Sequence, residues 1–359
     1  MTRVPLRCAG GCLLLLLSAL IGGCARGDLE SRLDAYVAEL ETALPRPAAR
    51  RPTAPRLEPY PNRGEVRLPV DELRVGLLRF LSLDRRCGIG ILVAQRNSAI
   101  GMVMPDSQRL VYEQTLLMRL DDCLRRLAAE SDAIPSTEEL AQLLARKSSE
   151  IDRVFWNATF AGPELERLFS LSGAGTLAPE ALADSGASSR EALDFLSRSY
   201  RNLGPQGPTL DGSALELHLQ NLALENYGGR LIATAARLVV ALEAAAAALE
   251  ANPRSADCTA LGAVHEEQVL AWLQPFIATL VVAAKDFLGR LQRLAELPRE
   301  GPQGTRLVGA SAAFDGYRQR FLSIEPAAGL WQRLDSASAR HRGAWSARLR
   351  DCGLDSGEG

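Results

Sequence analysis

The chain has 359 residues, a formal net charge of −2 at pH 7 and a hydrophobic fraction of 47%. This length suffices for one large domain or two ordinary ones. The nearly neutral charge excludes a protein that binds nucleic acid through a strongly basic surface.

The N-terminus reads as an export signal. An apolar run of nine residues, 13–21, follows Arg3 and Arg7. A membrane-spanning helix needs roughly 20 apolar residues, so this run is too short to span. A short basic region before a short apolar core is typical of a secretory signal peptide, predicted here over residues 1–23.

The end of that signal, Ile21-Gly22-Gly23-Cys24, resembles a bacterial lipobox. In lipoproteins of that type the cysteine becomes the N-terminus and carries acyl chains such as palmitate, which anchor the protein in a membrane. The alternative is an ordinary cleaved signal with a chance cysteine. By resemblance to sorted lipoproteins, Ala25 after the cysteine favours the outer membrane. We therefore expect a protein of the bacterial cell envelope, lipid-anchored at Cys24 and facing the periplasm.

Two segments follow the anchor. Residues 24–44 contain an amphipathic helix, because apolar residues recur three or four positions apart on one face: Leu29, Leu33, Tyr36, Leu40 and Leu44. Residues 45–69 contain seven prolines, which exclude a helix and favour an extended chain. This segment is either a spacer from the membrane or a strap over the body; Leu57 and Tyr60 favour the strap.

Residues 70–355 read as an all-helical body, with possible halves 70–205 and 210–355. Ser136, Ser188 and Ser213 each precede a glutamate by three residues, the pattern of an N-terminal capping box. Pro105 and Pro163 stand where the first turn of a helix accepts proline.

Three segments of the body, 224–249, 270–294 and 314–331, repeat apolar residues with alternating spacings of three and four. This alternation is the packing stripe of antiparallel bundles. We expect kinks at Gly228-Gly229 and at Pro275. The predicted fold is all-α, an elongated antiparallel helical bundle.

The cysteines predict two intramolecular disulfides. Cys8 and Cys12 leave with the signal and Cys24 carries the anchor; an even number remains in an oxidising compartment. Residues equidistant from the turn of a helix hairpin lie opposite each other. The midpoint of Cys87 and Cys123 is Pro105, and the midpoint of Cys258 and Cys352 is residue 305, beside a predicted loop. The other pairings centre less well, so we predict Cys87–Cys123 and Cys258–Cys352.

No catalytic motif is recognisable. His265 begins "HEEQV", which lacks the second histidine of a zinc protease motif, and neither a nucleophile elbow nor a phosphate-binding loop is present. His341 falls in phase with a packing stripe, which predicts a half-buried structural histidine. The sequence gives no reason to expect a metal or a cofactor.

Two polar stretches are the candidate sites. One surrounds the turn at Pro105, and the other lies at the aromatic end of a helix before Pro163. Their residues are Arg96, Asn97, Ser98, Ser107, Gln108, Arg109, Trp156 and Asn157. Polar clusters at such turns commonly satisfy exposed backbone ends, and Asp106 or Ser107 is placed to cap a helix. Arg96 is expected to pair with Glu113 across the hairpin.

The stretches "RLPVDELRVGLLRFLSL", "LVAQRNSAIGMVMPDSQRLVYE" and "WNATFAGPELERLFSLS", with the lipobox, resemble the proteobacterial lipoprotein family named domain of unknown function 3080. The resemblance covers most of the mature chain. It implies an envelope lipoprotein and no activity, so it assigns no catalytic residue.

Three functions remain open. The favoured one is a non-enzymatic binding or structural component of the envelope, tethered to the membrane and able to engage an envelope protein. The second is a hydrolase with an unrecognised site around residues 96–109. The third is a carrier of an apolar ligand between helices.

Overall fold

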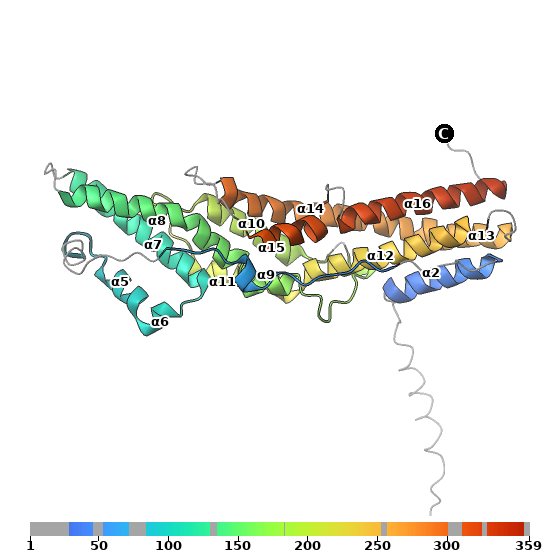
Figure 1. Cartoon of the computed structure of the whole chain (residues 1–359), viewed down its shortest axis with the longest axis horizontal. Coiled ribbons are helices and arrows are strands. Elements are labelled where there is room, and N and C mark those ends of the chain that lie inside the picture. Colours follow the sequence, from blue (N-terminus) through green and yellow to red (C-terminus); the bar gives the residue numbers. More distant parts are fainter. Residues whose placement is uncertain are drawn as a thin grey trace, which may run out of the picture.

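The computed structural model describes residues 29–45, 53–71, 84–129, 135–182, 184–252, 257–300, 311–324 and 329–354. The predicted signal peptide, Cys24 and the turn at residue 305 lie outside these residues. The described chain is all-helical, without a strand, and forms an elongated body (Figure 1).

The helices follow the chain as α2 (Leu29–Ala43), α3 (Arg63–Val66), α5 (Gly90–Asn97), α6 (Ala99–Met102), α7 (Asp106–Ala129), α8 (Pro135–Thr159), α9 (Pro163–Leu168), α10 (Ala187–Arg201), α11 (Gly212–Leu224), α12 (Tyr227–Glu250), α13 (Cys258–Val264), α14 (Gln274–Glu300), α15 (Ala312–Tyr317) and α16 (Leu330–Asp351). A 3-10 turn (Pro179–Ala181) and two π-helical stretches, η2 (His265–Leu273) and η3 (Arg318–Leu322), complete the order.

One end of the body is formed by α7 and α8, which pack along each other; at the other end α16 and α2 pack on α12 (Figure 1). Helices α9, α10 and α11 lie between these ends. A continuous hydrophobic core runs through the described residues. The body is therefore a long stack of helices with one shared interior.

Helix α2 confirms the amphipathic prediction for the N-terminal segment. All five residues of the predicted stripe are buried, from Leu29 to Leu44. The helix packs against α12 and α13. The chain is thus part of the body from Leu29 onward.

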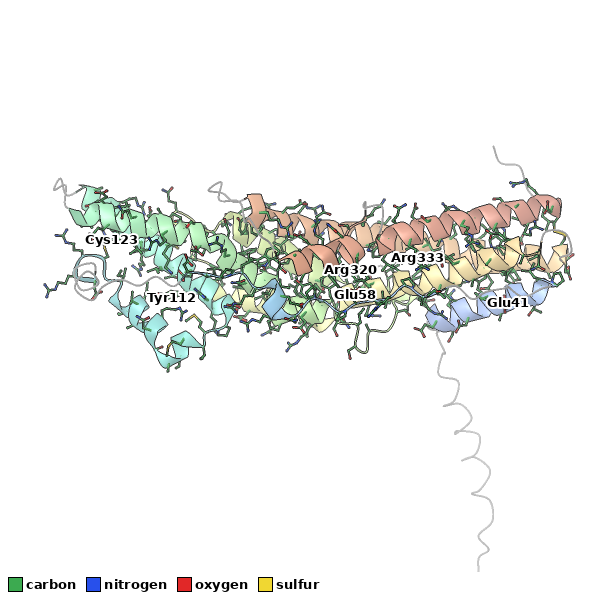
Figure 2. The ribbon with its side chains drawn as sticks, in the orientation of Figure 1. Glu41, Glu58, Tyr112, Cys123, Arg320 and Arg333 are labelled. Carbon is green, nitrogen blue, oxygen red and sulfur yellow. A yellow bond between two sulfur atoms is a disulfide. The ribbon has the colours of Figure 1, made fainter. Side chains whose placement is uncertain are left out.

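The described part of the proline-rich segment, residues 53–71, is a strap on the body. Tyr60 and Val66 are buried, and the Tyr60 ring stacks on Phe169 at 5.7 Å between centroids. Glu58 forms an ion pair with Arg320 at 2.9 Å (Figure 2). Arg333 donates to the carbonyl of Thr53. For these residues the strap alternative is correct.

The helix breaks differ from the predicted kinks. Asn226, with a left-handed φ of 48°, separates α11 from α12, so the glycine pair lies in the first turn of α12 rather than at a kink. A Cβ on Gly228 would lie 2.4 Å from the Phe169 ring, so glycine is needed there for close packing. The π-helical stretch η2 ends just before Pro275, where the missing N–H disturbs the hydrogen-bond ladder.

The apolar stripe predicted over 314–331 does not lie on one helix. It is divided between α15, η3 and the start of α16, although Phe314, Tyr317, Phe321 and Trp331 are all buried as the stripe requires. Pro326, which cannot continue a helix, lies in the gap outside the described residues.

The capping patterns predicted helices that are present, but other residues cap them. Helix α11 is capped by Asp211, two residues before Ser213, and α10 begins after Gly186, which has a φ of 74°. The Ser188 hydroxyl instead donates to Glu225. Pro163 is the first residue of α9, as predicted. The Ser136 side chain lies outside the described part of the chain.

Both predicted disulfides are confirmed. Cys87 and Cys123 have Cα atoms 5.2 Å apart, and Cys258 and Cys352 have Cα atoms 5.5 Å apart. The geometry around the first differs from a packed hairpin, because α5 and α6 diverge from α7 (Figure 1). The disulfide joins the start of the α5–α6 arm to α7, and the arm diverges from α7 beyond it.

Two helical stretches are long and apolar enough to cross a membrane by length and composition alone, Gly212–Glu250 and Cys258–Arg299. The apolar window of the first is 67% buried inside the body, as in a core helix. The window of the second is 28% buried. Much of η2 and α14 therefore faces away from the core.

Candidate functional site

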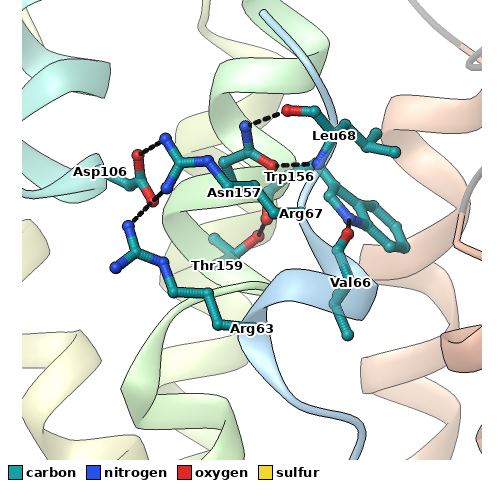
Figure 3. Close-up of polar contacts among 8 residues, drawn as sticks. All are labelled: Arg63, Val66, Arg67, Leu68, Asp106, Trp156, Asn157 and Thr159. Atoms are coloured by element: carbon teal, nitrogen blue, oxygen red, sulfur yellow. Dashed lines mark hydrogen bonds and ion pairs between the residues drawn. The ribbon is translucent and has the colours of Figure 1, made fainter.

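Trp156 and Asn157 hold the strap on the body (Figure 3). The Asn157 side chain accepts from the Leu68 N–H and donates to the Leu68 carbonyl, both at 2.8 Å, as a neighbouring strand would. The Trp156 Nε1 donates to the Val66 carbonyl at 2.9 Å. Both side chains are buried, so the role that the structure assigns to them is the satisfaction of strap backbone groups.

A carboxylate fixes the same strap from another side. Asp106, the first residue of α7, accepts from Arg63 at 2.7 Å and from Arg67 at 2.7 and 2.9 Å (Figure 3). A carboxylate is favoured at a helix N-terminus by the helix dipole. The arginines come from α3 and the residue after it, so this ion-pair cluster ties strap to helix.

Arg96 and Ser98 shape the junction of α5 and α6. The Ser98 hydroxyl accepts from the Gly101 N–H at 3.0 Å and so caps α6, while Arg96 donates to the Gly101 carbonyl at 2.7 Å. A Cβ at Gly101 would lie 2.0 Å from the Gln95 carbonyl oxygen, so the turn requires glycine. Asn97 is exposed at the end of α5.

The predicted Arg96–Glu113 ion pair is wrong. Glu113 pairs with Lys147 on α8, whose ammonium lies 2.9 Å from both carboxylate oxygens, and Arg109 lies 3.9 Å away. Ser107 donates to Glu216 on α11 at 2.6 Å, and Gln108 is exposed. The polar candidates thus divide among the strap, the α5–α6 turn and the flank of α7, and do not converge on one reactive centre.

Buried ionisable groups also lie outside those stretches, among them Asp152 and His341. Burial raises the pKa of Asp152 to about 6, although a hydrogen bond from the Tyr200 hydroxyl at 2.7 Å opposes the rise. Burial lowers the pKa of His341 to about 4, with smaller contributions from His265 and Arg342. His341 is therefore a neutral imidazole, and it is fully rather than half buried.

His341 belongs to a polar cluster in the core. The Tyr36 hydroxyl and the His341 Nε2 share a hydrogen bond at 2.5 Å, and the Trp345 Nε1 donates to the Tyr36 oxygen at 2.9 Å. This cluster joins α2 to α16 across more than 300 positions of sequence. Local sequence patterns cannot reveal such a contact.

A groove of about 630 Å³ lies between α14 with η2 on one side and α16 on the other. His341 and Ser338 lie on its α16 wall. Its remaining lining is chiefly apolar, and the apolar side chains are Val269, Leu273, Ile277, Ala278, Val281, Ile324, Trp331 and Leu334.

The polar residues of the groove include two cations and one carboxylate. Lys285, Arg342 and Asp335 line the groove and are exposed. A concave apolar surface with a few polar groups is the common form of a small-molecule site. The arrangement suits a ligand with a long apolar part and an acidic end, and it contains no evident nucleophile–base pair.

No local sequence pattern predicts this groove. Half of its apolar side chains belong to packing stripes that predict contact with other helices: Leu273, Ile277, Ile324 and Trp331. The only local signal is the excess of apolar residues on η2 and α14, where Leu270 and Val282 remain exposed. Whether such a face meets a helix or an opening depends on tertiary structure.

Within the described residues, no group of three or more histidine, cysteine, aspartate or glutamate side chains is placed to hold a metal ion. The sequence model of a family described as "Protein of unknown function (DUF3080)" matches residues 33–356. No curated protein and no solved structure matches the chain.

Proposed function

The chain belongs to the DUF3080 family, whose description names no activity, and we propose on physical grounds that it is a lipid-anchored, non-enzymatic binding protein of the bacterial envelope. Its ligand is an acyl-chain molecule with a carboxylate or phosphate end, bound in the groove between α14 and α16. The observation that carries this proposal is the groove itself, open and largely apolar, with cations beside it.

The size and chemistry of the groove support this ligand class. A volume of about 630 Å³ lies within the usual range for small-molecule sites. Burying an acyl chain against Ile277 and Trp331 contributes roughly 0.8 kcal/mol per methylene group. Lys285 and Arg342 would attract an acidic end, and together with Asp335 they leave a net charge of +1.

The anchor is supported by sequence. Cys24 ends a lipobox-like site, and α2 begins only five residues later. Export followed by acylation would place the folded body at a membrane surface, where acyl-chain molecules are abundant. The membrane surface would then be the source of the ligand for the groove.

The contacts around residues 96–109 favour a binding role over the hydrolase alternative. Ser98 caps α6, Ser107 donates to Glu216, and Arg96 binds a backbone carbonyl. Each of these side chains has a structural partner, and among the described contacts no histidine is bonded to either serine. A binding role accounts better for the shape of the molecule.

Quenching of tryptophan fluorescence by brominated fatty acid tests the groove, because bromine quenches only tryptophans that it contacts. Trp331 lines the groove, so titration of the purified mature protein should quench it, and Trp331→Phe should remove that component. Ala278→Phe should fill the groove and weaken binding at least tenfold. Ala145→Phe, on an exposed position of α8, is the matched control. Quenching unchanged in Ala278→Phe would exclude this groove as the site.

The acidic end is tested separately. Removing both charges with Lys285→Ala and Arg342→Ala should weaken the fatty acid but leave the fatty alcohol of equal length unchanged. Equal losses for both ligands would show that the cations do not recognise the acidic end.

The anchor is tested by Cys24→Ala, which should abolish acylation and release the protein from membranes. Mass spectrometry of the wild-type N-terminus and membrane fractionation are the measurements. A variant that still sediments with the outer membrane, together with an unmodified wild-type cysteine, would refute the anchor.

A further inference from the structure

The segment of residues 84–103, here called the elbow, exposes an unusual share of apolar surface. It contains α5 and α6, and only Cys87, Ile89 and Gly101 are buried within it. Four of the nine large apolar side chains exposed in the described chain lie here: Ile91 (75%), Ile100 (81%), Met102 (68%) and Val103 (80%). Three of them lie within four residues at the tip, so the elbow ends in an apolar knob.

The elbow is held in a defined shape although it buries little. The disulfide Cys87–Cys123 fixes its base to α7. The Ser98 cap and the Arg96 hydrogen bond fix its bend. Exposed apolar residues on a structured, covalently held element indicate a surface that meets a partner.

The charge and position of the elbow favour a lipid bilayer as that partner. Arg85 and Arg86 are exposed at its base, and no acidic residue follows Asp84 within it. Basic residues beside an apolar face are typical of segments that lie in a membrane interface. The elbow and α2 also lie along the same long edge of the body (Figure 1). Helix α2 begins five residues after Cys24, and five extended residues span at most roughly 18 Å.

We propose that the elbow is a second membrane contact, inserting Ile100, Met102 and Val103 into the interface while Arg85 and Arg86 meet anionic headgroups. This inference rests on the proposed lipid anchor for its setting. With the anchor near one part of the long body and the elbow at another, the body would lie along the membrane rather than stand away from it. One acyl or apolar contact alone binds weakly, and two linked contacts bind more firmly.

Vesicle flotation of the full mature chain carrying Cys24→Ala tests the elbow without the anchor. Vesicles of phosphatidylethanolamine and phosphatidylglycerol should retain the protein weakly, and vesicles of phosphatidylcholine should retain less. Ile100→Asp with Val103→Asp should lower the partition coefficient at least tenfold. Both positions are exposed, so circular dichroism and thermal unfolding should remain those of the parent.

Val282→Asp on α14 is the matched control, because Val282 is 68% exposed but lies away from the elbow. It should leave flotation unchanged. Equal losses in the control and the elbow variant, or no binding of the parent to anionic vesicles, would overturn the proposal. So would a dimer of the parent that the elbow substitutions dissociate, because a second copy would then cover the knob.

These outcomes are independent of the anchor. Suppose that Cys24 is acylated and that Cys24→Ala releases the protein from membranes. If the elbow variants then bind vesicles as the parent does, only the elbow proposal fails. If Cys24 is not acylated while the parent still binds vesicles through the elbow, the anchor fails and the elbow stands.

Discussion

Each end of the body contains a disulfide, but the two disulfides have different structural roles. At one end, Cys258–Cys352 joins α13 to the end of α16, among helices that pack on one another and bury Leu261 and Trp345. At the other end, Cys87–Cys123 holds an elbow whose longer helix, α5, contains no buried residue. A disulfide between packed helices reinforces contacts that exist without it. A disulfide at the elbow replaces contacts that the elbow lacks.

Removing each disulfide in turn should therefore give the largest difference in stability between the two ends. In the chain-entropy model, loops of 94 and 36 residues correspond to roughly 5 and 4 kcal/mol. We expect Cys258→Ser with Cys352→Ser to lower the global free energy of unfolding by up to that larger value. Cys87→Ser with Cys123→Ser should cost much less, because the freed elbow regains conformational entropy while the core stays folded.

Denaturant unfolding gives the global change, and hydrogen exchange gives the local one. Loss of the elbow disulfide should raise exchange in residues 84–103 while α12 and α16 stay protected. Equal global losses in the two double variants would contradict the comparison, and would show that the elbow is coupled to the core.

The packed end should also respond to pH through His341. Its pKa is about 4 in the folded protein against an ordinary value of 6.5. The unfolded chain therefore binds a proton between these values that the folded chain excludes. The free energy of unfolding should fall as the pH falls through this window, by about 2.5 kcal/mol at pH 4.5 relative to neutral pH.

Asp152 opposes this change. Burial raises its pKa from 3.8 to about 6, so the folded chain retains a proton that the unfolded chain releases, and stability falls as the pH rises through that window. Urea unfolding of Asp152→Asn should thus show a larger acid loss of stability from His341 than the wild type does. His341→Gln, which cannot gain a proton, should remove it. An acid loss that persists in His341→Gln would assign the effect to another group.

The same contrast explains what the sequence could predict. The buried stripe of α2 could be predicted because helical spacing alone decides which face is buried. The disulfide pairs were readable from their midpoints, although α5 and α6 diverge from α7 where a packed hairpin was expected. Cysteine pairing needs only that the two ends meet, and it does not specify what lies between them.

The contacts of single polar side chains could not be predicted from the sequence. Asn157 was identified as a candidate, but its partner Leu68 lies 89 positions away, on a strap that could also have been a free spacer. The Tyr36–His341 contact and the groove depend on helices that no local pattern places side by side. Local spacing predicts which residues face inward, and tertiary packing decides what they meet.

The smallest effect concerns the ion pair at the boundary between elbow and body. Arg96 belongs to the elbow and binds its own turn, whereas Glu113 belongs to the body and binds Lys147. A double-mutant cycle between Glu113→Gln and Lys147→Met should give a coupling of about 1 kcal/mol or more, above the 0.2–1 kcal/mol of exposed pairs, because both side chains are nearly buried. The same cycle between Glu113→Gln and Arg96→Met should give a coupling near zero. Urea unfolding of the six proteins measures both values, and a larger coupling for Arg96 would mean that the elbow closes onto α7 in solution.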